Sequence, residues 1–288
     1  MSSSIDDNVN IEDTVRFINQ LATSDGSLKS PINLNISDMK VVELNPVEWF
    51  NYDSTPKKLK LTNTGRTVLL SATWQAERPY LRGGPFVSSY KFSQIHFHWG
   101  KTDMNGSEHY VDGGSVPMEM HAVHFKSDYE THEAALRKDD GISILVYFLQ
   151  LQAAPNPFLD DIIRALPFIQ TVHSSVRLIS FPLTNLLRSF QRDYFVYWGS
   201  VMLTNIRNSI LWLITREPIG ISLEQVAKFR TVQDERGVPI LTNRQALQDR
   251  GGRNIFFVCP SGSTYATLLP IRHVFRTEIQ EENDGKEK

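Results

Sequence analysis

The stretch of residues 94–125 constrains this chain more than any other, because it holds five of the eight histidines of the sequence. It opens with Gln-Ile-His-Phe-His-Trp-Gly at 94–100 and closes with Met-Glu-Met-His-Ala-Val-His-Phe at 118–125. Both ends alternate polar with apolar residues, which predicts two half-buried β-strands. Residues i and i+2 of a strand point to the same face, so His96 and His98 project together.

A third histidine, His121, lies on the second of these strands and predicts a metal site if the two strands are neighbours. Three imidazole nitrogens about 2.0–2.1 Å from a zinc ion leave a fourth tetrahedral position open for water. A cupin-type metal oxygenase also starts from a His-x-His pair. Its glutamate ligand should follow within a few residues, whereas Glu108 comes ten residues after His98 (108 − 98). The three-histidine site is therefore favoured.

Strand-like segments recur along the rest of the chain and predict a β-dominated α+β fold. Residues 142–149 are apolar almost throughout, as expected of a central strand that is buried on both faces. The other predicted strands are residues 32–36, 58–63, 67–71 and 210–214. Helices are predicted over 158–169, where Asp160 and Asp161 suit the positive N-terminal end, and over 222–229, which Ser222 caps. We expect a single domain on a large central, mostly antiparallel twisted sheet with peripheral helices.

Composition limits the remaining possibilities. The domain is expected over residues 28–277, between a polar N-terminal segment (1–27) with a short helix at 11–21 and a charged, disordered tail (278–288). The net charge of −2 and the absence of a basic run argue against a nucleic-acid partner. Cys259 is the only cysteine, so no intrachain disulfide forms. The start lacks the features of a signal peptide and no apolar run reaches 18 residues. We expect a cytoplasmic monomer with no membrane contact.

The motifs inside and outside the histidine stretch resemble those of α-class carbonic anhydrases. The matching segments are Gln94-x-His96-x-His98-Trp99-Gly100, Gly106-Ser107-Glu108-His109, Glu119-x-His121-x-Val123-His124, Ser30-Pro31-Ile32-Asn33, Gly83-Gly84-Pro85, and Trp212 followed by Glu217-Pro218-Ile219. They follow the family's order and approximate spacing from about residue 28 to about residue 276. The resemblance therefore covers most of the chain.

The resemblance implies a catalytic zinc held by His96, His98 and His121, with carbon dioxide and bicarbonate as substrates. Metal-bound imidazoles donate their other N–H to a fixed acceptor. By resemblance, these acceptors are Gln94 for His96, Glu119 for His121 and the backbone carbonyl of Asn243 for His98. The resemblance also implies an apolar wall for carbon dioxide at Val123, Ile144, Val201 and Trp212. His109 and His124 match buried structural residues, with His109 near Tyr197.

The segment Gly-Ser-Val-Met-Leu-Thr-Asn at 199–205 departs from the family pattern, which reads Gly-Ser-Leu-Thr-Thr-Pro-Pro. The first threonine of that pattern accepts a hydrogen bond from the zinc-bound hydroxide and donates one to the glutamate that matches Glu108. Met202 stands in its place, and a thioether is a weak acceptor with no proton to donate. Losing such a bond costs on the order of 1–3 kcal/mol, or about ten- to a hundredfold in rate.

A second departure is Arg66, which stands where the fast members of the family carry a proton-shuttle histidine. Arginine stays protonated at physiological pH and cannot relay a proton. Two functions remain open. The first is a zinc lyase that interconverts carbon dioxide and bicarbonate with reduced turnover, favoured by the intact histidines and Glu108. The second is a carbonic-anhydrase-related binding module, favoured by Met202.

Overall fold

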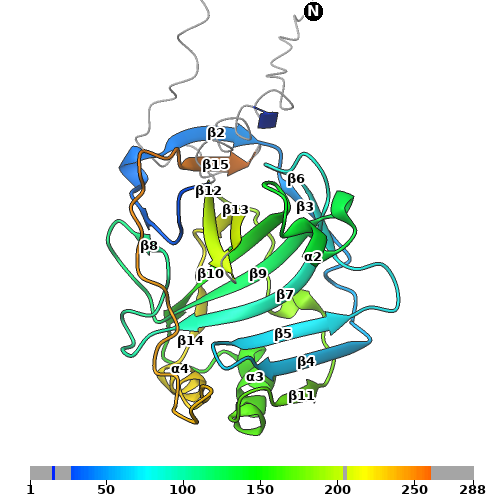
Figure 1. Ribbon diagram of the computed structural model, residues 1–288, viewed down its shortest axis with the longest axis vertical. Coiled ribbons are helices and arrows are strands. Elements are labelled where there is room, and N and C mark those ends of the chain that lie inside the picture. The colour runs from blue at the N-terminus through cyan, green and yellow to red at the C-terminus, as the bar shows by residue number, and fades with distance from the viewer. Residues whose placement is uncertain (1–14, 17–26, 204–205, 261–288) are drawn as a thin grey trace, which may run out of the picture.

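The described part of the chain folds around a 13-stranded twisted sheet that crosses the middle of the computed structural model (Figure 1). The structure describes residues 15–16, 27–203 and 206–260. In their order across the sheet, the strands of the main path are β11 (Ser175–Leu178), β4 (Lys58–Asn63), β5 (Val68–Thr73), β7 (Tyr90–Trp99), β9 (Met118–Lys126), β10 (Ile142–Leu151), β13 (Ile206–Thr215), β12 (Tyr194–Leu203), β15 (Phe256–Pro260) and β2 (Lys40–Leu44).

Shorter strands complete the β-structure. β14 (Ile219–Ile221) pairs with β10, while β3 (Val47–Phe50) pairs with β6 (Tyr80–Gly83), which joins β7. β1 (Asn33–Leu34) and β8 (Tyr110–Val111) form a separate parallel pair. The parallel pairs of the described large sheet are β10–β13, β10–β14 and β15–β2, and its other pairs are antiparallel, which confirms the predicted sheet type.

The helices lie at the periphery of the sheet, as predicted, and they are short. Within residues 27–203 and 206–260 they are η1 (Ile36–Asp38), η2 (Ser127–Tyr129), α2 (His132–Ala135), η3 (Pro157–Leu159), α3 (Asp160–Ala165), η4 (Leu166–Ile169), η5 (Leu183–Asn185) and α4 (Leu223–Phe229). Figure 1 shows α3 and α4 together at one end of the molecule. In the described part of the chain, no helix has both the length and the apolar character that a membrane span requires.

The predicted elements are confirmed where the pattern is simple and differ where the chain bends. Ser222 caps α4 in a capping box with Gln225, as its sequence indicates. The helix predicted over 158–169 is instead a 3₁₀–α–3₁₀ succession, and Pro167 lies in its last part. The strand predicted over 32–36 is shorter, because the chain enters η1 at Ile36. Residues 15–16 of the predicted helix 11–21 are helical, and the predicted tail 278–288 lies outside the described residues.

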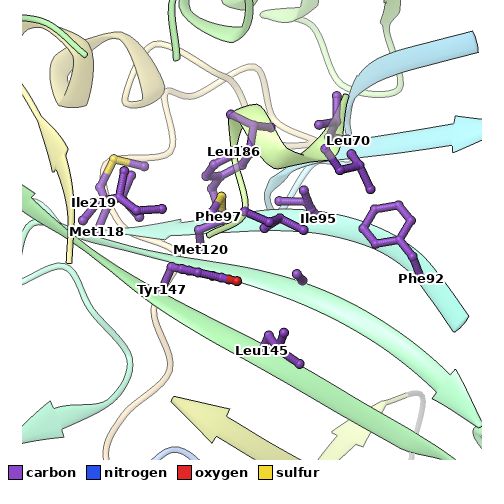
Figure 2. Close-up of a cluster of buried hydrophobic side chains, with 14 of the residues drawn as sticks. Leu70, Phe92, Ile95, Phe97, Met118, Met120, Leu145, Tyr147, Leu186 and Ile219 are labelled. Carbon is purple, nitrogen blue, oxygen red and sulfur yellow. The ribbon is translucent and has the colours of Figure 1, made fainter. Parts of the chain in front are cut away.

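The central strands separate two hydrophobic clusters, because alternate side chains of each strand enter different clusters. One cluster takes Met120 and Ala122 of β9 with Leu145 and Tyr147 of β10, and Figure 2 shows part of it. The other cluster lies on the histidine face of the same strands. Its members from β9, β10, β12 and β13 are Val123, Phe125, Ile142, Ile144, Val146, Phe148, Phe195, Tyr197, Ile210, Trp212 and Ile214.

Strand register places the site. β7 and β9 are antiparallel neighbours, and His96 pairs directly with His121 across them. On the same face, Val123 of β9 pairs with Ile144 of β10, which pairs in turn with Trp212 of β13. The histidines therefore lie beside a continuous row of apolar side chains.

Candidate metal centre

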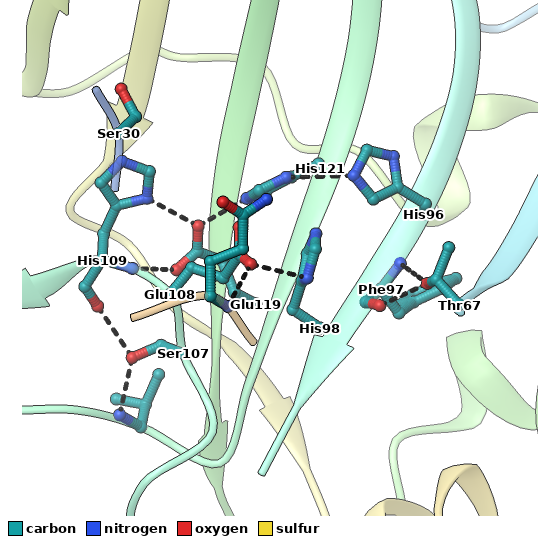
Figure 3. A network of polar contacts seen from close by, with 12 residues as sticks. Ser30, Thr67, His96, Phe97, His98, Ser107, Glu108, His109, Glu119 and His121 are labelled. Atoms are coloured by element: carbon teal, nitrogen blue, oxygen red, sulfur yellow. Dashed lines mark hydrogen bonds and ion pairs between the residues drawn. The ribbon is translucent and has the colours of Figure 1, made fainter. Parts of the chain in front are cut away.

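The three histidines converge on the face that the sequence predicts. His96 and His98 come from β7, and His121 comes from β9. The ring centroids are 5.0 Å apart for His96 and His98, 5.0 Å for His96 and His121, and 4.5 Å for His98 and His121. One nitrogen of each ring lies within 4.8 Å of the others, so these residues form a group that could hold a metal ion. Figure 3 shows the rings of this triad.

Each ring has one nitrogen that faces the other two rings, called here the inner nitrogen, and one that faces away from them, the outer nitrogen. Each outer nitrogen has a hydrogen-bond acceptor, and these are the acceptors implied by the resemblance. The distances are 3.1 Å from Nδ1 of His96 to Oε1 of Gln94, 2.5 Å from Nε2 of His121 to Oε1 of Glu119, and 3.4 Å from Nδ1 of His98 to the carbonyl oxygen of Asn243. An acceptor requires the facing ring nitrogen to carry the proton. In a neutral imidazole the inner nitrogen then carries a lone pair.

The inner nitrogens need a cation. Nε2 of His98 is buried and has no hydrogen-bond partner. Nε2 of His96 lies 3.2 Å from Nδ1 of His121, and with both outer nitrogens protonated this contact brings two lone pairs together. A bound cation converts this repulsion into coordination, and three neutral imidazoles suit zinc. The residues present therefore fit the metal that the resemblance implies.

Electrostatics keep two of the three ligands neutral. Burial lowers the pKa of His96, and the neighbouring His121 and His98 lower it further. Burial also lowers the pKa of His121, with His98 adding to the effect, although Glu119 opposes it. Burial pulls the pKa of His98 down as well, but Glu108, Glu119 and the Asn243 carbonyl together raise it. Neutral imidazole is the form that binds metal.

Glu119 anchors the corner of the site at His121. Its side chain is fully buried, and it accepts the backbone N–H of His109 at 2.8 Å and Nδ1 of the same residue at 2.7 Å. Burial raises the pKa of Glu119, but His109 and His121 outweigh it and the net pKa is lowered. Nε2 of His109 lies 2.7 Å from the Tyr197 hydroxyl, which confirms the predicted neighbour. His109, Glu119 and His121 also lie close enough for a metal, but their polar atoms already bond one another.

Glu108 anchors a different corner. Its Oε1 lies 3.1 Å from Nδ1 of His98 and accepts the backbone N–H of Gln245 at 2.8 Å. Burial raises the pKa of Glu108, and attraction to His98 together with His121 more than compensates, so the net pKa is lowered. Within the described ranges, these are the polar partners of Glu108, and neither comes from β12.

The predicted departures lie at exposed positions. Met202 is 50% exposed and pairs with Arg207 near the end of the β12–β13 hairpin. Arg66 is exposed in the turn between β4 and β5, where its carbonyl accepts Nδ2 of Asn243 at 3.0 Å. Gly65 precedes it with φ +79, in the turn that the sequence predicts.

The predicted wall for carbon dioxide lies beside the triad. Val123, Ile144 and Trp212 are buried in one cluster, and Val201 packs against it while partly exposed. The Trp212 ring centroid is 5.3 Å from that of His121. The structure thus brings the predicted ligands and wall residues together on one face of the sheet.

Two contacts were not foreseen, one made by the side chain of Asn243, whose carbonyl was predicted to serve His98, and one made by the backbone of Gln245. The side chain of Asn243 donates to the carbonyl of Phe97 at 2.8 Å and accepts the N–H of Trp99 at 2.8 Å, so it holds β7 on both sides of His98. The backbone N–H of Gln245 reaches Glu108. A backbone donor leaves no trace in residue identity, so no sequence signal could have indicated Gln245.

Comparison with known proteins agrees with this geometry. A sequence profile described as eukaryotic-type carbonic anhydrase matches residues 16–259. The chain is 34% identical over 238 residues to carbonic anhydrase 1 of Monodelphis domestica, covering 81% of this chain and 89% of that protein. It is 35% identical over 237 residues to carbonic anhydrase 1 of Oryctolagus cuniculus, covering 80% and 98%. It is 34% identical over 232 residues to carbonic anhydrase 3 of Equus caballus, covering 79% and 88%.

Proposed function

Since the chain belongs to the eukaryotic-type carbonic anhydrase family, we propose that it catalyses the reversible hydration of carbon dioxide with a zinc ion bound by His96, His98 and His121. We propose further that its turnover is reduced by the residues at positions 202 and 66.

The observation that carries the proposal is the arrangement of the three inner nitrogens. Each ring has its outer nitrogen engaged by an acceptor, and the inner nitrogens face one another, with that of His98 buried and without a partner. A purely structural cluster of histidines would instead satisfy its buried polar atoms. This arrangement supports a resident cation.

When bound, zinc supplies a Lewis acid that makes a water molecule nucleophilic near neutral pH. The chain's own residues do the rest. The outer acceptors hold the three rings in the tautomer that points a lone pair inward. Val123, Ile144 and Trp212 give apolar carbon dioxide a surface beside the triad. Because the wall and the ligands belong to one sheet, their separation is set by strand register.

Reduced turnover follows from two side chains. Met202 cannot donate a hydrogen bond to Glu108, and among the described residues the polar partners of this carboxylate are His98 and Gln245. Arg66 cannot accept and release a proton at physiological pH. The first substitution is expected to slow the attack on carbon dioxide, and the second to slow proton export.

Zinc content and stopped-flow carbon dioxide hydration test the proposal on zinc-loaded protein. We expect one zinc per chain and measurable hydration, and both should be lost in His96→Ala because two imidazoles cannot complete the tetrahedron. His173→Asn is the matched control, since His173 is exposed at φ +62 and pairs with Glu235. Stoichiometric zinc in His96→Ala would refute the ligand assignment. Zinc without hydration in the wild type would favour the binding module.

A further inference from the structure

Glu108 is buried, yet the side chain that the family pattern places against it is missing. The residue is 3% exposed, and a buried carboxylate requires donors or a positive partner. The threonine of the family pattern is Met202 here, and a thioether has no proton to donate. The Met202 side chain is also half exposed.

The Glu108 carboxylate instead contacts His98, one of the three histidines of the triad. Oε1 of Glu108 lies 3.1 Å from Nδ1 of His98, which is shorter than the 3.4 Å from that nitrogen to the Asn243 carbonyl. The Gln245 N–H, 2.8 Å from the same oxygen, fixes the carboxylate in place. Figure 3 shows Glu108 and Glu119 beside the triad, each in contact with a different histidine.

We infer that Glu108 in this chain is a positioning residue for the metal ligand His98, so that two of the three ligands are backed by carboxylates. The inference rests on the proposed zinc site and deepens it. Nδ1 of His98 lies within reach of both the Glu108 carboxylate and the Asn243 carbonyl, and the nearer of these two groups carries the negative charge.

The physical consequence concerns metal affinity. A carboxylate at the outer nitrogen fixes the tautomer and orientation of an imidazole and raises the basicity of its inner nitrogen. Glu119 does this for His121 at 2.5 Å. With Glu108 doing the same for His98, this site holds zinc more tightly than a site in which only one ligand has a carboxylate.

Zinc affinity of the purified full chain, measured by competition with a chromogenic chelator, tests the inference. Glu108→Gln keeps an oxygen acceptor and removes the charge, and we expect a loss of about tenfold, at the low end of the 10- to 100-fold range for such changes. Asp103→Asn is the matched control, because the Asp103 carboxylate pairs with the Arg230 guanidinium, 2.7 Å away, and not with a histidine of the triad. Its zinc affinity should equal that of the wild type.

A double variant isolates the mechanism. In a Met202→Thr background the threonine hydroxyl offers Glu108 a new donor, and the further loss of zinc affinity caused by Glu108→Gln should shrink. An unchanged affinity in Glu108→Gln with a zinc-binding wild type overturns the inference. Absence of stoichiometric zinc in the wild type overturns the proposed function instead.

A second measurement keeps the inference testable if Glu108→Gln does not fold. In the zinc-loaded wild type, histidine-labelled for NMR, the Nδ1 proton of His98 should resonate further downfield than that of His96. Charge-assisted hydrogen bonds are the stronger ones, and the acceptor of His96 is the neutral amide of Gln94. A His98 proton at or upfield of the His96 position overturns the inference.

Discussion

Glu119 and Glu108 sit at two corners of one histidine triad and are held in different ways. Glu119 lies within strand β9 and meets His121 on its own strand and His109 from the loop before β8. Glu108 lies in that loop, and its partners are His98 and the backbone of Gln245, 137 residues away. Both carboxylates are almost completely buried.

This difference shows which part of the site tolerates a substitution at position 202. Glu119 has three donors, one from His121 on its own strand and two from His109, and none of them involves position 202. Glu108 lies in a loop and is held by His98 and by the backbone of Gln245 in another loop, and we propose that Met202 deprives it of a hydroxyl donor. Divergence at Met202 is therefore expected to leave metal binding intact and to reduce catalysis.

Glu119→Gln should have the largest effect, because an amide offers one oxygen to the three donors that the carboxylate accepts. The NH₂ group then faces at least one buried donor. We expect a loss of about 3 kcal/mol in the free energy of unfolding and about 100-fold in zinc affinity. Urea unfolding and chelator competition measure both. A smaller loss of zinc affinity than in Glu108→Gln would reverse the comparison.

His124 shows what a buried histidine of β9 does without a carboxylate. Its Nε2 lies 2.6 Å from the Tyr52 hydroxyl and its Nδ1 lies 3.0 Å from the Ala122 carbonyl. Burial lowers its pKa to about 3, although the carbonyl opposes the shift. The unfolded chain binds a proton below about pH 6.5 and the folded chain does not, so stability is lost as the pH falls from about 6.5 towards 3.

The expected slope from this one group is at most about 1.4 kcal/mol per pH unit. Urea unfolding between pH 7 and pH 4.5 should show a shallower slope in His124→Gln than in the wild type. The contributions of all other groups cancel in this difference. Equal slopes in the two proteins would contradict a neutral buried His124.

Met202→Thr should raise carbon dioxide hydration by about tenfold or more, because it offers Glu108 a hydroxyl donor and the bound nucleophile an acceptor. Stopped-flow hydration at equal zinc content measures it. Met104→Thr is the matched control, since Met104 is 69% exposed in the loop after β7. Unchanged or lower activity with zinc still bound would mean that the hairpin does not place residue 202 over the metal.

Arg66→His should have the smallest effect, a few-fold rise in turnover at low buffer concentration. A histidine relays protons near neutral pH, whereas Arg66 does not. In the wild type, imidazole buffer should raise turnover until it saturates and leave kcat/KM nearly flat. Arg82→His, at another exposed arginine, serves as the control. If turnover does not change with imidazole concentration at constant ionic strength, the rate-limiting step is the hydration of carbon dioxide, slowed by Met202, and not proton transfer.

Much of the metal centre could be predicted because strand geometry is local. The i and i+2 rule places His96 beside His98 without knowledge of the rest of the chain, and the alternation around His121 sets its face. The capping box at Ser222 is likewise encoded within four residues. The helix predicted over 158–169 was wrong in its continuity, because apolar spacing does not distinguish α from 3₁₀ turns around Pro167.

The sequence by itself determined the two histidine strands, the three candidate ligands and the missing hydroxyl at position 202. Only the tertiary structure decided that Glu108 turns to His98, that Asn243 holds β7 on both sides of that ligand, and that the Gln245 backbone fixes the carboxylate. The reason is physical. The side-chain direction on a strand follows from neighbouring residues, whereas a contact across more than a hundred residues depends on how loops close, and a backbone donor is the same in nearly every residue type.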